Sequence, residues 1–326
     1  MRDFKYRKLL IDNPEWKTVM LAVANVRSDC LKECAAAFHA NLDRTGFVQM
    51  WPAEIAFQVR RDTIWQCNAA NLTEGRSHSH IMQVINQKPT PEFMYAMDVQ
   101  INELEEQPIE VQHFLRTQLG IQYIEKMLEM NQGMQLSIDA LFASIVVSSW
   151  TAFECLASDA WVKAVNNGPK EWRIKVNDSR HVKLKPGEPE DEKPDLKIDP
   201  LEDYAGSLRE AGRVSFQRLS TIKRNYSIIF DKPTMRMLFD DAAGGYIAAL
   251  SQVRNILAHK AGVADGEFEK KTKTFPELSV FKEKNPVLLD GEIVKKLRNA
   301  ALIVGEGLIR FIDDIITPAP AAPSSP

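Results

Sequence analysis

The stretch "LSIDALFASIVVSSWTAFECLASDAWVKAV", residues 136–165, decides the fold class. Its apolar side chains lie on most sides of a helical projection, and such a helix is typically buried at the centre of a bundle. Gly168 and Pro169 follow it and predict where the helix ends. The longest uncharged run, residues 140–153, is shorter than the roughly 20 residues that a membrane span needs. We therefore interpret the stretch as the central helix of a soluble protein.

Helical patterns continue on both sides of this stretch. Near the N-terminus, Asn13 and Pro14 suit an N-cap and a first helical residue, and the apolar residues after them recur at helical spacing. We predict helices over residues 14–43, 52–72, 111–131, 136–165, 201–230, 234–260 and 290–316. The sequence has no internal repeat and no long alternating apolar pattern, so it predicts an all-α fold.

The predicted helices form two regions. A polar stretch, "NELEEQP" at residues 102–108, separates a helical N-terminal region over residues 1–110 from a helical bundle over residues 111–316. We expect the N-terminal region to sense a signal, to bind a partner or to inhibit the bundle.

Two segments have the composition of irregular structure. Residues 171–200 hold four prolines and dense mixed charge, so we predict a mobile insertion there. Within it, residues 172–176 and 181–184 are expected to form a short hairpin. The tail, residues 317–326, is predicted to be disordered because of its composition.

The bulk composition limits the classes of function. The 326-residue chain has a formal net charge of -3, so no global positive field attracts nucleic acid and any anion-binding surface must be local. The first residues are charged and lack the apolar core of a secretory signal. We expect a cytoplasmic protein without a membrane partner, whose four cysteines are free thiols. These are Cys30, Cys34, Cys67 and Cys155.

The glycine pair Gly244 and Gly245 does not have the pattern of a phosphate-binding loop. It lies within a helical pattern, without Walker A spacing and without a preceding strand. The pair indicates close helix packing or a kink.

Two groups of histidine and cysteine are candidate metal ligands. The first is His78 with His80, and the second is Cys30 and Cys34 with His39. A structural zinc site usually has paired ligands at tight spacing at both ends, and neither group has that. We therefore predict no metal and no cofactor.

The stretch "SQVRNILAHKAG", residues 251–262, carries the most informative motif. On a helix, one arc of apolar residues makes the core face: Leu250, Val253, Ile256 and Leu257. Asn255 and His259 lie together away from that arc, about 40° apart at about 100° per residue. Arg254 lies at the edge of the core face, from which its side chain can reach either His259 or a facing helix.

These side chains suit the metal-independent cleavage of a phosphodiester bond in RNA. The 2'-hydroxyl must lose a proton to attack phosphorus, and histidine exchanges protons near neutral pH. The transition state gathers negative charge on its non-bridging oxygens, which a guanidinium binds in a bidentate geometry. An asparagine can orient the phosphate or the imidazole through hydrogen bonds.

A structural interpretation of the same motif stays open. Arginine and histidine near the end of a helix complement its dipole, and a histidine there is often a C-terminal cap. The spacing also occurs by chance, since Arg76 and His80 lie four residues apart in a polar connection.

At these residues the sequence resembles the HEPN family (higher eukaryotes and prokaryotes nucleotide-binding domains). Its ribonuclease members have an Arg-Asn-x-x-x-His motif on a late helix, which here is "RNILAH" at residues 254–259. The segments "SSWTAFECLASDAW" at residues 148–161 and "KAGVADGEF" at residues 260–268 also look like the family. The resemblance covers roughly residues 111–316.

The resemblance implies a helical bundle that forms a homodimer, in which both motif helices face one cleft and together make the nuclease. It implies cleavage that leaves a 2',3'-cyclic phosphate or a 3'-phosphate. His259 would then be the general acid and base, Arg254 would bind the scissile phosphate, and Asn255 would position them, with Lys260 in support. Members often carry an acid on the long helix, and Glu154 is the candidate here, either as a catalytic group or as a structural ion pair with Arg254.

Positive charge for RNA binding has to come from outside the motif. The nearest candidates are Lys223 and Arg224 in "TIKRNY" and Lys270, Lys271 and Lys273 in "EKKTKTF". Both runs are weak signals, because lysines are usually solvated. The acidic insertion is unusual beside an RNA cleft.

The function expected from these observations is that of an endoribonuclease. Family analogy makes it a toxin or anti-phage defence effector that is held in check by an antitoxin or a defence-complex partner. The alternatives are a non-catalytic HEPN-like dimerisation or scaffold domain, and a sensor that binds a nucleotide without cutting it.

Overall fold

The computed structural model describes residues 25–46, 132–179, 204–210 and 214–318, and a few isolated positions between residues 56 and 124. Apart from one isolated β-bridge between Val263 and Pro286, the regular structure of these residues is helical. The predicted all-α fold is therefore confirmed. The helices predicted over residues 52–72 and 111–131 fall almost entirely outside the described residues, as does the predicted tail.

The chain divides into two compact units. The first comprises residues 1–13, 46–142 and 290–292, and the second comprises residues 14–45, 143–289 and 293–326. Nearly all of the described residues belong to the second unit. Residues 25–45, which the sequence assigned to the N-terminal region, belong to it as well.

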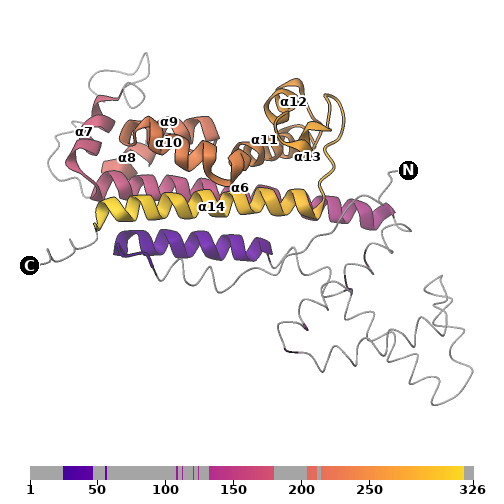
Figure 1. The fold of residues 1–326 in the computed structure, drawn as a ribbon, viewed down its shortest axis with the longest axis horizontal. Helices are drawn as coiled ribbons and strands as arrows, with labels where there is room; N and C mark the ends of the chain where they lie inside the picture. The colour runs from indigo at the N-terminus through magenta and orange to yellow at the C-terminus, as the bar shows by residue number, and fades with distance from the viewer. Residues whose placement is uncertain are drawn as a thin grey trace, which may run out of the picture. The chain divides into compact units, whose positions relative to one another are not determined.

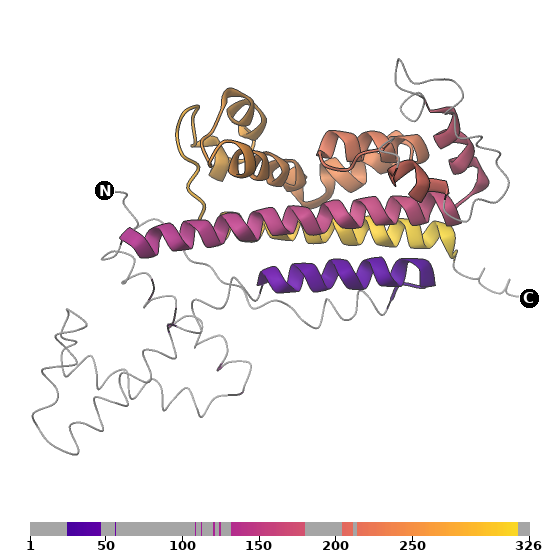
Figure 2. The same ribbon diagram turned by 180° about the vertical axis from the view of Figure 1, so that it is seen from behind.

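Three long helices form the core of the second unit. They are a helix over residues 29–46, α6 (Gln132–Asn167) and α14 (Gly291–Ile316). They run alongside one another and are drawn in indigo, magenta and yellow (Figure 1 and Figure 2). Their largest inward side chains are exposed by 2% or less: Leu31, Phe38, Trp150, Phe153, Trp161, Leu297 and Leu308. α6 is the central helix that its sequence predicted, and it ends directly before Gly168.

Polar contacts at both ends fix the 29–46 helix against α14. At its start, the backbone N–H groups of Arg27 and Ser28 donate to the buried carboxylate of Asp313, at 2.9 and 2.7 Å. At its end, the Arg298 guanidinium donates to the hydroxyl of Thr45 at 3.0 Å. Because the start of one helix contacts the end of the other, the two helices are antiparallel.

A glycine allows the three helices to approach closely. A Cβ atom placed on Gly305 of α14 would lie 2.4 Å from the ring of Phe38 and 2.9 Å from a methyl group of Leu156. Both neighbours are almost fully buried, so neither has room to move away. This position therefore requires a residue without a side chain.

The prediction of a β-hairpin at residues 172–176 is wrong, because this segment belongs to the helix α7 (Lys170–Asp178). Trp172 and Val176 are four residues apart and both are buried, which is the spacing of one helical face. The ring of Trp172 packs edge-on against Phe230 at 5.6 Å between centroids. The first part of the predicted insertion is thus ordered by packing, and residues 180–203 lie outside the described residues.

The helix predicted over residues 234–260 is divided into four elements: α10 (Lys232–Arg236), η3 (Met237–Asp241), η4 (Ala242–Gly245) and α11 (Tyr246–His259). The interruption lies at Ala243, Gly244 and Gly245, whose φ angles are 51°, 59° and 75°. Two glycines make this left-handed turn accessible. The interpretation of the glycine pair as a kink is confirmed, and the kink sets the direction of α11.

One helix among the described residues, α6, is long and apolar enough to cross a membrane by length and composition. Half of the apolar stretch of α6 that meets this criterion is buried inside the protein. The core helix of a soluble protein has these same properties.

We predict that Gly305→Ala destabilises the protein whereas Gly307→Ala does not. Both replacements gain helix propensity of up to about 1 kcal/mol, but only the first forces a methyl group into Phe38 and Leu156, at a cost of roughly 1–3 kcal/mol. A Cβ on Gly307 meets only Leu238, at an ordinary 3.5 Å. Chemical unfolding of both variants measures the difference. Equal stabilities would show that the three helices do not pack this closely.

Candidate functional site

α11 has one face in the core and another that faces a cleft. On the predicted core face, Leu250 and Val253 are fully buried. On the other side, Arg254 and Asn255 are partly exposed and His259 is exposed. Ile256 is buried as well, whereas Leu257 is partly exposed, so the predicted division into an apolar arc and a polar arc is confirmed except at Leu257.

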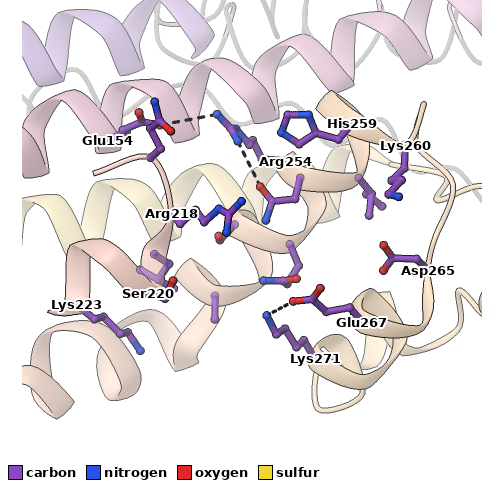
Figure 3. Close-up of a pocket in the computed structure, with 17 residues that line it drawn as sticks. Glu154, Arg218, Ser220, Lys223, Arg254, His259, Lys260, Asp265, Glu267 and Lys271 are labelled. Carbon is purple, nitrogen blue, oxygen red and sulfur yellow. Dashed lines mark hydrogen bonds and ion pairs between the residues drawn. The ribbon is translucent and has the colours of Figure 1, made fainter. Parts of the chain in front are cut away.

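A cleft of about 940 Å³ lies along the polar face of α11 (Figure 3). Its other walls come from α6, from the start of α9 (Leu219–Ile229) and from the region around the start of α12 (Gly266–Thr272). All five residues that the sequence selected for the site line this cleft: Glu154, Arg254, Asn255, His259 and Lys260. The structure thus brings the predicted residues together.

Arg254 reaches the facing helix and also contacts the neighbouring Asn255 on its own helix. Its Nη2 atom lies 3.9 Å from Oε2 of Glu154 on α6, and both side chains are about one-quarter exposed. Its Nη1 atom donates to Oδ1 of Asn255 at 3.3 Å. Figure 3 shows both contacts as dashed lines at one end of the cleft. The distance to Glu154 is that of an ion pair without a short hydrogen bond.

Glu154 is held in place by a second partner on its own helix. The indole Nε1 of Trp150 donates to Oε2 of Glu154 at 2.9 Å, and Trp150 is 1% exposed. Partial burial raises the pKa of the Glu154 carboxyl, whereas the Trp150 hydrogen bond and the Arg254 charge act to lower it. Glu154 is therefore a partly desolvated carboxyl group that a buried indole donor and a guanidinium at ion-pair distance stabilise.

His259 is not used to cap its helix. The N–H groups of Lys260 and Gly262 both donate to the carbonyl of Ile256, at 2.9 and 3.0 Å. Gly262 adopts φ 76° and completes a backbone cap of the left-handed type. Within the described residues, the imidazole of His259 has neither a hydrogen bond nor an ion pair. It is thus available to a ligand in the cleft.

The wall opposite α11 was not predicted from the sequence. The helix expected over residues 201–230 is divided into α8 (Tyr204–Glu210) and α9. Between them Phe216 is buried against the ring of Trp161, 5.7 Å away, and Asn225 donates to the carbonyl of Ser215 at 2.9 Å. These contacts hold an extended segment that leads to Arg218.

Arg218 begins α9 and lines the cleft. Its N–H donates to the hydroxyl of Thr221 at 3.3 Å, and that hydroxyl donates back to the carbonyl of Arg218 at 2.7 Å. The available signal in the sequence was the pair Ser220-Thr221, because hydroxyl residues favour helix starts. It locates the helix start but does not identify Arg218 as a cleft residue.

The wall around the start of α12 is fixed to α11 through a polar contact made by the neighbouring helix α13. The Tyr246 hydroxyl, in the first turn of α11, donates to Glu277 of α13 (Pro276–Ser279) at 2.6 Å. Lys296 forms an ion pair with the same carboxylate. Lys296, followed by the Tyr246 hydroxyl, lowers the pKa of Glu277 to about 2. α13 and the neighbouring α12 are thereby held beside the cleft.

The basic residues predicted for RNA binding separate into two groups. Lys223 and Lys271 line the cleft, and Arg224, Lys270 and Lys273 do not. Lys223 forms an ion pair with Asp240, and Lys271 forms one with Glu267. Both lysines in the cleft are therefore already paired with acidic groups.

No group of three or more histidine, cysteine or acidic side chains in the described part of the chain is arranged to hold a metal ion. Cys30, Cys34 and Cys155 are free thiols, and His39 is buried at 3% exposure. Cys67, His78 and His80 lie outside the described residues.

Comparisons with protein-family models, with curated proteins and with solved structures returned no match for this chain. The chemistry of the cleft is therefore inferred from its own side chains. Within the described part of the chain, the cleft presents an imidazole without a polar partner, a guanidinium and an amide, which are groups that can transfer protons and stabilise negative charge.

We predict that Arg254→Ala lowers stability at pH 7 by roughly 1 kcal/mol, and by less at pH 5. Burial raises the pKa of Glu154, so above the ordinary carboxyl pKa the charged form of Glu154 destabilises the folded state. Loss of Arg254 increases this destabilisation, because the arginine partly offsets the carboxylate charge. As the pH falls through the pKa of folded Glu154, the carboxyl becomes neutral and the deficit shrinks. Urea unfolding at both pH values provides the measurement.

Glu154→Gln supplies the matched control for this prediction. In that background Arg254→Ala is expected to have little effect at either pH, because no carboxylate remains for the arginine to stabilise. The same deficit in both backgrounds would mean that the Arg254–Glu154 pair does not contribute to stability.

Proposed function

We propose that this protein is a metal-independent endoribonuclease of the HEPN type. The observation that carries the proposal is that Arg254, Asn255 and His259 share one cleft with Glu154 of the central helix. The imidazole is exposed and its helix is capped by backbone groups, which favours a ligand-directed role for His259 over a capping role.

The reaction uses two proton transfers and one charged transition state. A general base takes the proton of the 2'-hydroxyl, the 2'-oxygen bonds to phosphorus, and the bond from phosphorus to the 5'-oxygen breaks. A general acid protonates that leaving oxygen, and the product is a 2',3'-cyclic phosphate. His259 serves the proton transfers, Arg254 binds the non-bridging oxygens, and Asn255 orients the guanidinium to which it is hydrogen-bonded.

A homodimer suits this chemistry. One imidazole cannot at the same moment accept a proton on one side of the phosphate and donate one on the other. Two copies of α11 that face one cleft would supply two imidazoles and two guanidiniums. The open cleft on the polar face of α11 is the surface at which the copies are proposed to meet.

Family analogy extends the proposal to the biological role. The protein would act in the cytoplasm as a toxin or anti-phage defence effector, with an antitoxin or a larger complex as its partner.

A non-catalytic scaffold is the second candidate function, and one observation favours it. Arg254 is engaged by Glu154 in an ion pair between α6 and α11, which is what a purely structural motif would show. If the protein is a scaffold, the wild type does not cleave RNA, and loss of Arg254 or His259 changes only stability or dimerisation.

The test is cleavage of RNA in EDTA by the wild type, His259→Ala and Arg254→Ala. We expect the wild type to cut, and the rate to fall by about 100- to 10,000-fold for the histidine variant and by about 100- to 1,000-fold for the arginine variant. Arg236→Ala is the matched control, because Arg236 is 75% exposed and does not line the cleft. Its activity should equal that of the wild type.

Oligomeric state, measured in parallel, separates the two candidates. An active dimer whose variants remain dimeric and folded supports the nuclease. An inert wild type whose variants are less stable or monomeric would overturn the nuclease and support the scaffold.

A further inference from the structure

Arg218 enters the cleft from the wall opposite the motif helix. It precedes α9, whereas Arg254 lies on α11, and both side chains line the same cleft. Figure 3 shows the two guanidinium groups in the same part of the cleft, on different elements. No part of the proposed reaction described above uses Arg218.

The charges around the cleft leave Arg218 without a counterion. Three of the cations that line the cleft are paired with acids: Arg254 with Glu154, Lys223 with Asp240, and Lys271 with Glu267. Within the described residues, Arg218 forms no ion pair, and its side chain is exposed. It is therefore a guanidinium available to an anionic ligand.

The backbone beneath this free side chain is firmly held. The carbonyl of Arg218 accepts from the N–H groups of Thr221 and Ile222 at 2.9 and 3.0 Å. Two residues earlier, Phe216 is 5% exposed and packs on Trp161 of α6. A fixed backbone that carries an unpaired guanidinium limits the entropy lost when a ligand binds.

The volume of the cleft limits how much of a nucleic acid one copy of the chain can hold. About 940 Å³ is near the upper end of small-ligand pockets, which measure roughly 300–1,000 Å³. In one copy of the chain, such a space accommodates a short run of single-stranded nucleic acid. A strand that crosses the cleft carries one charge at each phosphodiester, and guanidinium groups bind such phosphates in a bidentate geometry.

We propose that Arg218 binds the phosphate next to the one held by Arg254, so that the ligand of this cleft is single-stranded RNA with at least two consecutive phosphodiesters. This inference rests on the proposed function for the identity of the ligand. It adds the substrate class and a substrate-binding residue that lies outside the motif.

The test is equilibrium binding of uncleavable 2'-O-methyl oligonucleotides to the full-length chain. A trinucleotide has two phosphodiesters and a dinucleotide has one. We expect the wild type to bind the trinucleotide at least ten-fold more tightly. Arg218→Ala should lose most of that advantage and leave dinucleotide affinity unchanged, whereas Arg254→Ala should weaken both ligands. Arg236→Ala serves as the surface control, and melting temperatures confirm that each variant is folded.

Salt dependence and a conservative variant separate a phosphate contact from an effect on structure. Loss of one phosphate contact should reduce the slope of log affinity against log salt for the trinucleotide by about 0.7. Arg218→Lys should retain that slope and recover part of the affinity, because it keeps the charge and loses the bidentate geometry.

Each contrary result has a defined meaning. If Arg218→Ala weakens both ligands equally, or weakens neither, or if the wild type binds neither ligand, the inference is overturned. Cleavage of RNA by the wild type decides the proposed function independently. A wild type that cuts RNA while Arg218 has no effect preserves the nuclease and removes the second phosphate site. Binding that depends on Arg218, without any cleavage by the wild type, preserves the second phosphate site and removes the nuclease.

Discussion

The packing of α6 against α14 and the 29–46 helix is the constraint on which the rest of the structure depends. α14 and the 29–46 helix cover α6 so closely that Gly305 has no room for a methyl group. The two acidic residues in the middle of α6 are partly exposed, and each is paired with an arginine, because an unpaired buried charge is expensive. Glu154 meets Arg254 of α11, and Asp159 meets Arg209 of α8. The cleft lies where the polar face of α11 meets Glu154 of α6.

The sequence predicted the long helices and failed at the breaks between short ones, for a physical reason. Apolar spacing is a local property, and it was sufficient for α6, α11 and α14. The break before α9 depends on Phe216 packing on Trp161, a contact 55 residues away in sequence that no local pattern contains. The segment at residues 172–176 was misassigned because its helical form depends on Trp172 packing against Phe230. The break before α11 was indicated only in part: the glycine pair was interpreted as helix packing or a kink, but the sequence predicted one helix over residues 234–260.

The difference between local patterns and contacts distant in sequence also explains which part of the site was foreseen. Arg254, Asn255 and His259 lie on one helix, so their relative directions follow from helical geometry alone. Whether Arg254 would reach His259 or a facing helix could not be decided from the sequence, because the answer depends on where α6 lies. Arg218 was missed altogether, since its place in the cleft results from the packing of the extended segment before α9. Residues that converge from distant segments become visible only when the fold is known.

The structural and catalytic interpretations of the Arg254–Glu154 pair need not exclude each other. The carboxylate has its own donor in Trp150 at 2.9 Å, and Arg254 lies at the longer distance of 3.9 Å. Because the indole keeps its hydrogen bond, the guanidinium can turn toward a phosphate without leaving Glu154 wholly unpaired, which would be the expensive outcome. For the proposed reaction, Glu154 would thus hold Arg254 before the substrate binds, without binding it too tightly to be used. A carboxylate that formed short bidentate hydrogen bonds to Arg254 would compete strongly with the substrate, and the observed geometry avoids that competition.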